Sequence, residues 1–305
     1  MASTPRPALL VLNKIDATMA IVDPSSGRVV GKVATGDGPH EVATDGTFAY
    51  VGNYGAQTPG STISVIDFAA LKEVKRVDLG PMRRPHGLAL VGGKLFFTAE
   101  TNRLVASYDT ASGHLDWVMG TGQGATHMVW VHPSGSPIVT TNIGSDNVTL
   151  IERGATPLAW NMTQIATGRG PEGLDVSPDG RELWVAHSRD GGVSIIDLAA
   201  RTVTATIEAK TRRSNRLKFT PDGRLVLISD LDAGDLVVLD AKTRTAVRRM
   251  PLGRSPEGIL IPPDGSRAYV AVTGDSHVAV VDLRALQVVG KIETGQGPDG
   301  MAWVR

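Results

Sequence analysis

Three histidines in this sequence recur in similar short contexts, and imidazole is the side chain best suited to proton transfer near neutral pH. They are His40 in GPHE, His86 in RPHG and His127 in ATHM. Four further positions at the same repeat spacing, about 43 residues, also carry polar side chains. We expect these positions to form one set of candidate site residues: His40, His86, His127, Glu172, Asn215, Glu257 and Asp299.

Three interpretations of this set stay open at the level of sequence. In the first, water solvates polar side chains in a channel and they have no further role. In the second, the set is catalytic and its imidazoles and carboxylates act as acids, bases or hydrogen-bond donors to a substrate. The residues in that role are His40, His86, His127, Glu172 and Glu257. In the third, the three histidines hold a divalent metal with a nearby carboxylate, because such ligands suit zinc, copper or iron.

A second polar set closes the second strand expected in each repeat: Asn13, Asn53, Glu100, Asn142, His187, Asp230 and Thr273. In an antiparallel pair, the end of this strand lies beside the start of the first strand. We therefore expect Glu100, His187 and Asp230 to add ligand-binding groups at the same mouth as the histidines. Simple solvation of strand ends is the alternative explanation.

Arginines gather just before several of the first strands: Arg83, Arg84, Arg169, Arg212, Arg213 and Arg254. They either serve solubility or make one mouth attractive to a carboxylate or phosphate. Glu41 and Arg216 stand where four other repeats have glycine, so we expect their side chains to project into the mouth. Arg84, Glu41, Arg216 and Asp299 are therefore further predicted ligand-binding residues.

These residues can meet only if the chain returns every repeat to a common axis. Seven acids close short apolar strands at near-constant spacing: Asp23, Asp67, Asp109, Glu152, Asp197, Asp240 and Asp282. Each repeat contains four β-type runs separated by turn sequences such as SPDG and TPDG, without helical periodicity. The pattern predicts an all-β fold, a seven-bladed β-propeller with four antiparallel strands per blade. The recurring acids are interpreted as turn formers.

The two ends of the chain complement each other. Residues 8–34 supply only three strands, and the C-terminal segment PDGMAWVR matches the first strand of a repeat. We expect this C-terminal strand to close the first blade, which would protect the sheet edges. No linker or charge block divides the sequence, so we predict a single propeller domain over residues 1–305 and a monomer.

Composition excludes several classes of function. Thirty-one basic and thirty-one acidic residues balance, so no net field attracts nucleic acid or an anionic membrane. Cysteine is absent, which excludes disulfides and thiolate sites. No apolar run approaches the roughly 20 residues of a spanning helix or forms a signal-peptide core, so we expect a soluble chain without membrane insertion. The GxGxxG, P-loop, HExxH and GxSxG motifs are also missing.

The units AYVGN, LWVAH and AYVAV, with VxVID-like strands and PDG turns, resemble YVTN-repeat β-propellers, the YncE-like group, over essentially the whole chain. That group is similar to the lactonase-type seven-bladed propellers. The resemblance implies the propeller fold but no single activity. It also implies a periplasmic location for many relatives, whereas a native N-terminus would indicate the cytoplasm.

We therefore expect a propeller that binds a small anionic ligand, or a protein partner, at the mouth of its central channel. The PH contexts at His40 and His86 resemble the lactonase-type propellers and suggest the main alternative. In that alternative, the protein is a lactonase-like hydrolase or isomerase with a His/Glu/Arg site. A metal-binding propeller enzyme with a histidine ring is the third possibility.

Overall fold

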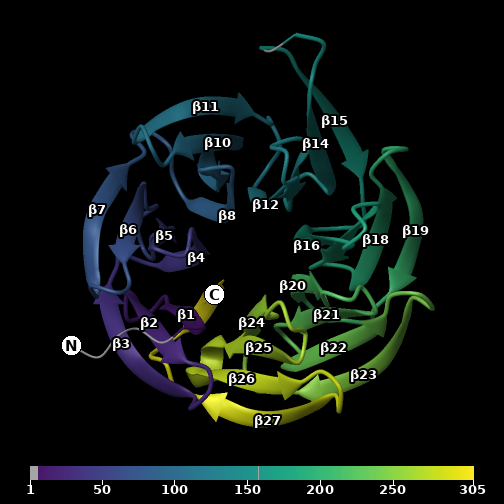
Figure 1. Ribbon diagram of the computed structural model, residues 1–305. Coiled ribbons are helices and arrows are strands. Elements are labelled where there is room, and N and C mark those ends of the chain that lie inside the picture. Colours follow the sequence, from purple (N-terminus) through teal and green to yellow (C-terminus); the bar gives the residue numbers. More distant parts are fainter. Residues whose placement is uncertain (1–5, 157) are drawn as a thin grey trace.

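The computed structural model describes residues 6–156 and 158–305, and it arranges the chain as blades around a central axis (Figure 1). The strands form seven four-stranded antiparallel sheets, and two short 3₁₀ helices, η1 Glu100–Asn102 and η2 Thr273–Asp275, follow β9 and β25. The predicted seven-bladed propeller is confirmed. Residues 1–5 and 157 of the predicted domain lie outside the described residues. No helix in the described ranges is long and apolar enough to cross a membrane.

Each blade runs from an innermost strand at the axis to an outermost strand at the rim. The innermost strands are β4 Pro39–Thr44, β8 Pro85–Val91, β12 Thr126–Val131, β16 Pro171–Val176, β20 Ser214–Phe219, β24 Pro256–Leu260 and β28 Pro298–Val304. The second strands are β1 Ala8–Asn13, β5 Phe48–Asn53, β9 Lys94–Ala99, β13 Ile138–Asn142, β17 Glu182–His187, β21 Leu225–Asp230 and β25 Arg267–Val272.

The outer half of each blade is equally regular. The third strands are β2 Thr18–Asp23, β6 Thr62–Asp67, β10 Leu104–Asp109, β14 Asn147–Arg153, β18 Gly192–Asp197, β22 Asp235–Asp240 and β26 His277–Asp282. The outermost strands are β3 Arg28–Ala34, β7 Lys72–Asp78, β11 His114–Gly120, β15 Trp160–Ala166, β19 Thr202–Glu208, β23 Thr245–Pro251 and β27 Gln287–Ile292. Blades are numbered below from the one that contains β1.

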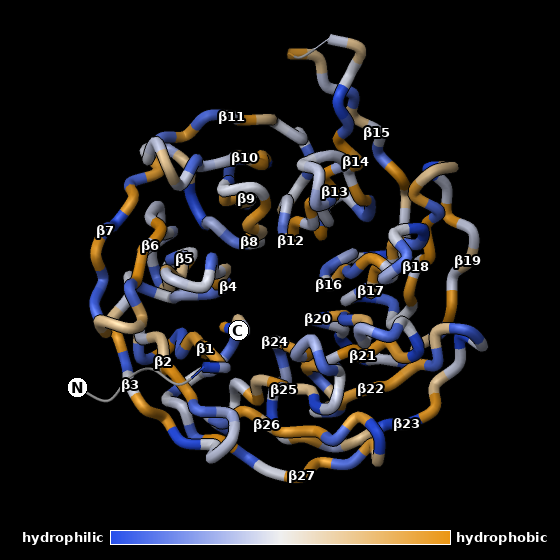
Figure 2. The backbone as a smooth tube through the Cα atoms, viewed as in Figure 1, coloured by the Kyte–Doolittle hydropathy of each residue, from blue (hydrophilic) through white to orange (hydrophobic). Residues whose placement is uncertain are grey.

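Burial follows position within the blade. The second strand β1 is buried along its whole length, because neighbouring blades cover both of its faces. The outermost strand β3 alternates exposed and partly buried residues, as expected for a strand with one face in water. Figure 2 shows the same mixture of polar and apolar residues along the outermost strands β7 and β23. The apolar core therefore lies between the blades and leaves the axis free for polar side chains.

The C-terminal strand closes the ring as predicted. β28 pairs antiparallel with β1, with Leu10 opposite Ala302 and Leu9 opposite Trp303. The first sheet therefore combines the two ends of the chain, and the C-terminus lies close to the axis (Figure 1). This pairing joins segments almost 300 residues apart and fixes the position of blade 1 relative to blade 7.

The acids that mark the repeat form turns, as predicted. Asp67 Oδ1 accepts hydrogen bonds from the amides of Ala69 and Ala70 at 3.0 and 2.8 Å. Equivalent bonds to the following turn are made by Asp23, Asp109, Asp197, Asp240 and Asp282. In blade 4 the acid is Glu152, which instead pairs with Arg201, the residue just before β19, at 2.8 Å.

Candidate functional site

A backbone irregularity turns one side chain of each blade toward the axis. The pairing of innermost and second strands shifts register at the start of the innermost strand in all seven blades. A β-bulge of this kind re-aims a side chain. The candidate set of seven residues occupies the second position of the seven innermost strands. In blade 3 the bulge is fixed by Thr98, whose hydroxyl accepts from the Gly87 amide at 3.0 Å and donates to the His127 carbonyl at 2.5 Å.

Glycine follows the candidate residue where neighbouring innermost strands nearly touch. A Cβ on Gly258 would lie 2.2 Å from the Asp299 carbonyl oxygen, and one on Gly300 would lie 2.3 Å from that of His40. Three blades depart from this rule, blade 4 with Met128 and blades 2 and 6 with Glu41 and Arg216. The side chains of Glu41 and Arg216 form an ion pair that joins blades on different sides of the channel, with Arg216 only 5% exposed and Glu41 15% exposed.

A cavity of about 500 Å³ opens at the mouth of the channel, bounded by side chains from several blades. It brings together eight of the predicted site residues and seven others. The lining residues are Lys14, His40, Tyr54, His86, Glu100, His127, Ile143, Glu172, Ser188, Arg189, Arg213, Asn215, Arg216, Leu231 and Glu257. Among the predicted residues, Glu41, Arg84 and Asp299 contact this lining from behind.

Three imidazoles from consecutive blades stack along one side of the cavity. The ring centroids of His40 and His86 are 4.3 Å apart, and those of His86 and His127 are 3.7 Å apart. His86 is only 1% exposed, and neither of its ring nitrogens has a hydrogen-bond partner among the described residues. Burial, together with the neighbouring His127 and His40, holds the pKa of His86 well below its ordinary value. The central ring of the stack is therefore neutral at physiological pH.

His40 belongs to a charged network below the stack. Its Nδ1 lies 2.8 Å from Asp299 Oδ2, and the same carboxylate oxygen lies 3.3 Å from Lys14 Nζ. Burial alone lowers the pKa of His40, but the attraction of the Asp299 carboxylate outweighs it, and the pKa of His40 is raised. Asp299 is fully buried; burial opposes its ionisation, yet His40 and Lys14 together hold its pKa well below the usual range.

Lys14 also pairs with Glu257, whose carboxylate lies 2.5 Å from its ammonium nitrogen. Burial and the nearby Asp299 raise the pKa of Glu257, while Lys14 acts in the opposite direction. Lys14 stays protonated, because although burial lowers its pKa, the carboxylates of Asp299 and Glu257 outweigh that effect and raise it. One lysine thus pairs with two carboxylates of the candidate set.

The remaining acids of the cavity are also engaged. Glu172 Oε1 accepts from the Asn215 amide at 2.7 Å. Glu100 Oε2 accepts from the Tyr54 hydroxyl at 2.9 Å and lies 3.4 Å from His127 Nδ1. Burial and the adjacent Glu100 raise the pKa of Tyr54 to about 12, so this phenol keeps its proton.

Besides Glu41, Arg84 and Asp299, two further predicted ligand-binding residues do not line the cavity. His187 is buried within blade 5, with Nδ1 2.8 Å from Asp190 Oδ1 and Nε2 2.9 Å from Ser194 Oγ. Asp230 is buried within blade 6, where it accepts the amides of Arg212 and Arg213 at 2.8 and 2.9 Å. These side chains fold back onto the loop that enters the innermost strand and fix it, so the expectation that they join the mouth is corrected.

Glu100 reaches the cavity because it occupies a different repeat position from His187 and Asp230. Ala99 pairs with Pro85 as Asn53 pairs with Pro39, so Glu100 corresponds to Tyr54. Both residues also donate their amides to the residue before the proline, Glu100 to the Arg84 carbonyl at 3.1 Å and Tyr54 to the Gly38 carbonyl at 3.0 Å. The position just after the second strand therefore faces the mouth.

Sequence reasoning named Glu100 and Thr273 at this position but missed its other members. The full set is Lys14, Tyr54, Glu100, Ile143, Ser188, Leu231 and Thr273, and six of the seven line the cavity. The usable signal for Tyr54 was its distance along the chain from the proline that begins the innermost strand, because Tyr54 follows Pro39 at the same distance as Glu100 follows Pro85. Lys14 gives no such signal, because the innermost strand beside it, β28, lies at the other end of the chain.

The described residues contain no group of three or more His, Cys, Asp or Glu side chains arranged to hold a metal ion. The three imidazoles instead stack on one another with interplanar angles of 47° and 33°. Metal binding by His40, His86 and His127 therefore stays a prediction.

Comparison with known proteins gives the family and the fold. A segment of 114 residues, 37% of this chain, is 35% identical to dihydro-heme d1 dehydrogenase of Pseudomonas aeruginosa, of which it covers 22%. The chain spans well under two thirds of the curated relatives it matches, between 21% and 36% of their lengths.

Among solved structures, the periplasmic gluconolactonase of Pseudomonas aeruginosa superposes with a TM-score of 0.77 at 21% identity, over 98% of this chain and 99% of that one. Hydrazine synthase of Kuenenia stuttgartiensis superposes equally well, with a TM-score of 0.77 at 20% identity over 92% and 93% of the two chains. At these identities the similarity shows the fold alone. The YNCE-like beta-propeller family matches residues 2–304, so the chain belongs to that family.

Proposed function

We propose that this propeller binds a small anionic ligand in the cavity at the channel mouth. The observation that carries the proposal is His86, a buried imidazole beside the cavity with two unpartnered nitrogens. Leaving a buried polar group unpaired costs about 1–3 kcal/mol. A ligand that supplies hydrogen-bond partners to the imidazole stack recovers part of this cost.

Charge favours an anion over a cation. Each acid of the lining already has a partner. Glu257 pairs with Lys14, Glu172 accepts a hydrogen bond from Asn215, and Glu100 accepts one from Tyr54. The rim adds cations with fewer ion-pair partners. Arg189 lies 4.0 Å from its nearest carboxylate, on Asp146, and Arg213 is exposed with no described side-chain partner. A carboxylate or phosphate entering the mouth therefore meets cationic groups that remain available.

The neutral imidazole of His86 suits the rest of such a ligand. An imidazole without a charge both donates and accepts a hydrogen bond, which matches hydroxyl groups. A hydroxyl-rich acid, such as a sugar acid, combines an anionic group for the rim with hydroxyls for the stack. The cavity of about 500 Å³ is within the range of small-molecule sites.

Titration calorimetry with a panel of sugar acids tests this proposal. We expect at least one compound to bind saturably and His86→Ala to weaken it by about tenfold, the value of one good hydrogen bond. His114→Ala is the matched control, because His114 is an exposed histidine on β11. Equal affinities of the two variants, or no binding across the panel, would contradict the proposal.

Lactone hydrolysis is a second candidate, favoured by the contact between His40 and Asp299. A carboxylate beside an imidazole orients it and raises its basicity, the arrangement of a general base. In the proposed reaction His40 removes a proton from water while that water attacks the lactone carbonyl. The ring C–O bond then breaks, and His40 returns the proton to the leaving alkoxide. The fold shared with a gluconolactonase supports this candidate.

A pH-stat assay with glucono-1,5-lactone separates the two candidates. Hydrolysis above the uncatalysed rate that His40→Gln abolishes and His114→Gln preserves supports the enzyme. Saturable binding without any acceleration supports a binding protein and refutes the hydrolase.

A further inference from the structure

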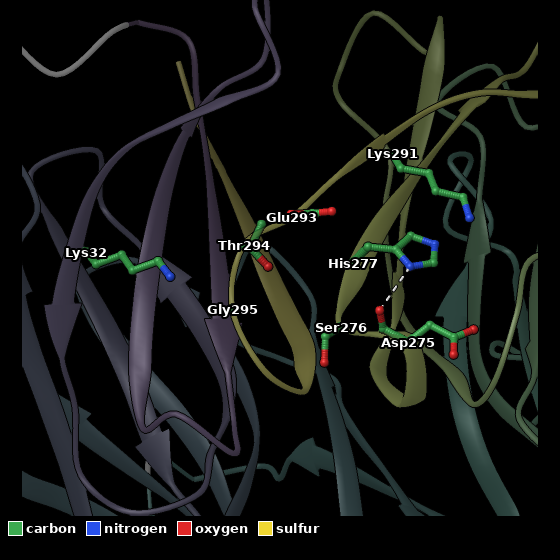
Figure 3. A pocket seen from close by; sticks show the side chains of 8 residues that line it. All are labelled: Lys32, Asp275, Ser276, His277, Lys291, Glu293, Thr294 and Gly295. Carbon is green, nitrogen blue, oxygen red and sulfur yellow. Dashed lines mark hydrogen bonds between the residues drawn. The ribbon is translucent and has the colours of Figure 1, made fainter.

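A second cavity lies away from the channel mouth, in a groove where blade 7 meets blade 1. Its volume is about 660 Å³, and none of its lining residues belongs to the mouth. Figure 3 shows Lys32 of β3 on one side, and Lys291 of β27 with His277 of β26 on the other. No ion pair of either lysine with a described residue is present, although the groove holds two positive charges.

His277 provides the buried polar group of this groove. It is 6% exposed, and its Nδ1 lies 3.3 Å from the Asp275 carbonyl oxygen. The other ring nitrogen, Nε2, has no hydrogen-bond partner among the described residues. In Figure 3 this nitrogen lies on the side of the ring that faces Lys291. The imidazole and the ammonium group are therefore available to the same ligand.

The corresponding place in blade 6 gives one example of what such a cation contacts. Arg249 pairs with Val237 as Lys291 pairs with Ala279, so Arg249 and Lys291 are equivalent. The guanidinium of Arg249 lies 3.5 Å from Asp230 and 3.3 Å from Asp235. Blade 6 thus neutralises its cation with two carboxylates of its own.

Blade 7 lacks both carboxylates. By strand register, Val272 stands at the position of Asp230, and His277 at the position of Asp235. The apolar Val272 cannot pair with Lys291, and His277 is not an acid. The cation of blade 7 is therefore retained without the anionic partners that the same position has in blade 6.

Blade 1 repeats the arrangement across the groove. Lys32 pairs with Ala20 at the same register position, and the two positions for carboxylates hold Asn13 and Thr18. These residues are uncharged and hydrogen-bond to each other at 3.1 Å. Two neighbouring blades thus each place one lysine in the same groove, and neither has a carboxylate at the two equivalent positions.

We infer that this groove binds an oxyanion, specifically a phosphate or a phosphate monoester, which takes the place of the two missing carboxylates. Lys32 and Lys291 supply charge, and Nε2 of His277, whose Nδ1 already donates to the Asp275 carbonyl, accepts a hydrogen bond from a phosphate hydroxyl. Of the acids nearby, Asp275 is committed to Arg254 at 2.7 Å. Glu293 is exposed and can accept hydroxyl groups of an ester. This site is independent of the function proposed for the mouth.

Titration of the full chain with inorganic phosphate, followed by the ring resonances of the histidines in NMR spectra, tests the inference. We expect saturable shifts of His277, whatever the response of His86 at the mouth, with sodium chloride matched for ionic strength. Lys291→Ala and Lys32→Ala should each weaken phosphate binding by about tenfold, the effect of one charge-assisted contact. Lys72→Ala, an exposed lysine on β7, is the matched control and should leave the affinity unchanged.

A paired substitution at one position gives the sharper test. His277→Asp restores the acid that blade 6 has at this position, whereas His277→Asn removes the imidazole without adding charge. We expect His277→Asp to bind phosphate at least tenfold more weakly than His277→Asn, because its carboxylate competes for Lys291. Absence of a saturable shift, or equal affinities of these two variants, would overturn the inference.

Discussion

Removing Arg216 should destabilise the propeller more than the loss of any surface ion pair. Its guanidinium is 5% exposed and pairs with Glu41, which is 15% exposed, and it also donates to Asn215 Oδ1 at 3.2 Å. Deleting one partner of a buried pair leaves the other charge uncompensated, at a cost of about 3–5 kcal/mol. For 305 residues the entropy of unfolding is about 0.6 kcal/mol per degree. Arg216→Leu should therefore lower Tm by about 5–8 °C.

Differential scanning calorimetry of three variants checks this reasoning. The double variant Glu41→Leu with Arg216→Leu removes both charges. It should recover most of the lost stability, because no unpaired charge then remains buried. Arg201→Leu breaks the half-exposed pair with Glu152 and should lower Tm by less than about 2 °C, as expected for a surface pair. The reasoning about the buried pair is refuted if Arg216→Leu lowers Tm by no more than Arg201→Leu does. It is also refuted if adding Glu41→Leu to Arg216→Leu fails to restore Tm.

Three further outcomes follow from the site and its scaffold. First, the raised pKa of His40 contributes stability in full below its unfolded pKa and loses it as pH rises through the folded pKa. His40→Asn should therefore lower the free energy of unfolding in urea by more at about pH 5.5 than at about pH 8.5. An equal decrease at both pH values would contradict the pairing of His40 with Asp299. Second, Gly258→Ala should lower the urea midpoint clearly and Gly120→Ala little, because only the first places a Cβ within 2.2 Å of another atom. Third, Asn53→Ala should lower the free energy of unfolding by about 1–3 kcal/mol, because Asn53 Oδ1 accepts a hydrogen bond from the Gly36 amide at 3.0 Å inside the blade. A loss below about 0.5 kcal/mol would show that this hydrogen bond is dispensable.

The sequence was sufficient for the fold because the fold repeats. Seven acids at near-constant spacing fixed the number of blades, and the matching ends predicted the pairing of β28 with β1. The histidine set was also predictable, since His40, His86 and His127 occupy one position of the repeat and the propeller brings that position to the axis.

The sequence was not sufficient to distinguish side chains that face the mouth from those that fold back into a blade. Glu100 and His187 both follow an apolar strand, but they differ by one position relative to the innermost strand. A one-residue difference reverses the direction of a side chain in a strand, which strand composition alone does not reveal. The ion pair between Arg216 and Glu41 was equally hidden, because nothing in the repeat indicates which residues meet across the channel.

NMR observation of the seven histidine rings during titration with the tightest-binding sugar acid is the most direct test of the mouth as a ligand site. The imidazole stack predicts saturable shifts for His40, His86 and His127, while the exposed His114 stays unchanged. Shifts confined to histidines outside the cavity, or none at saturation, would contradict the assignment of the channel mouth as the binding site.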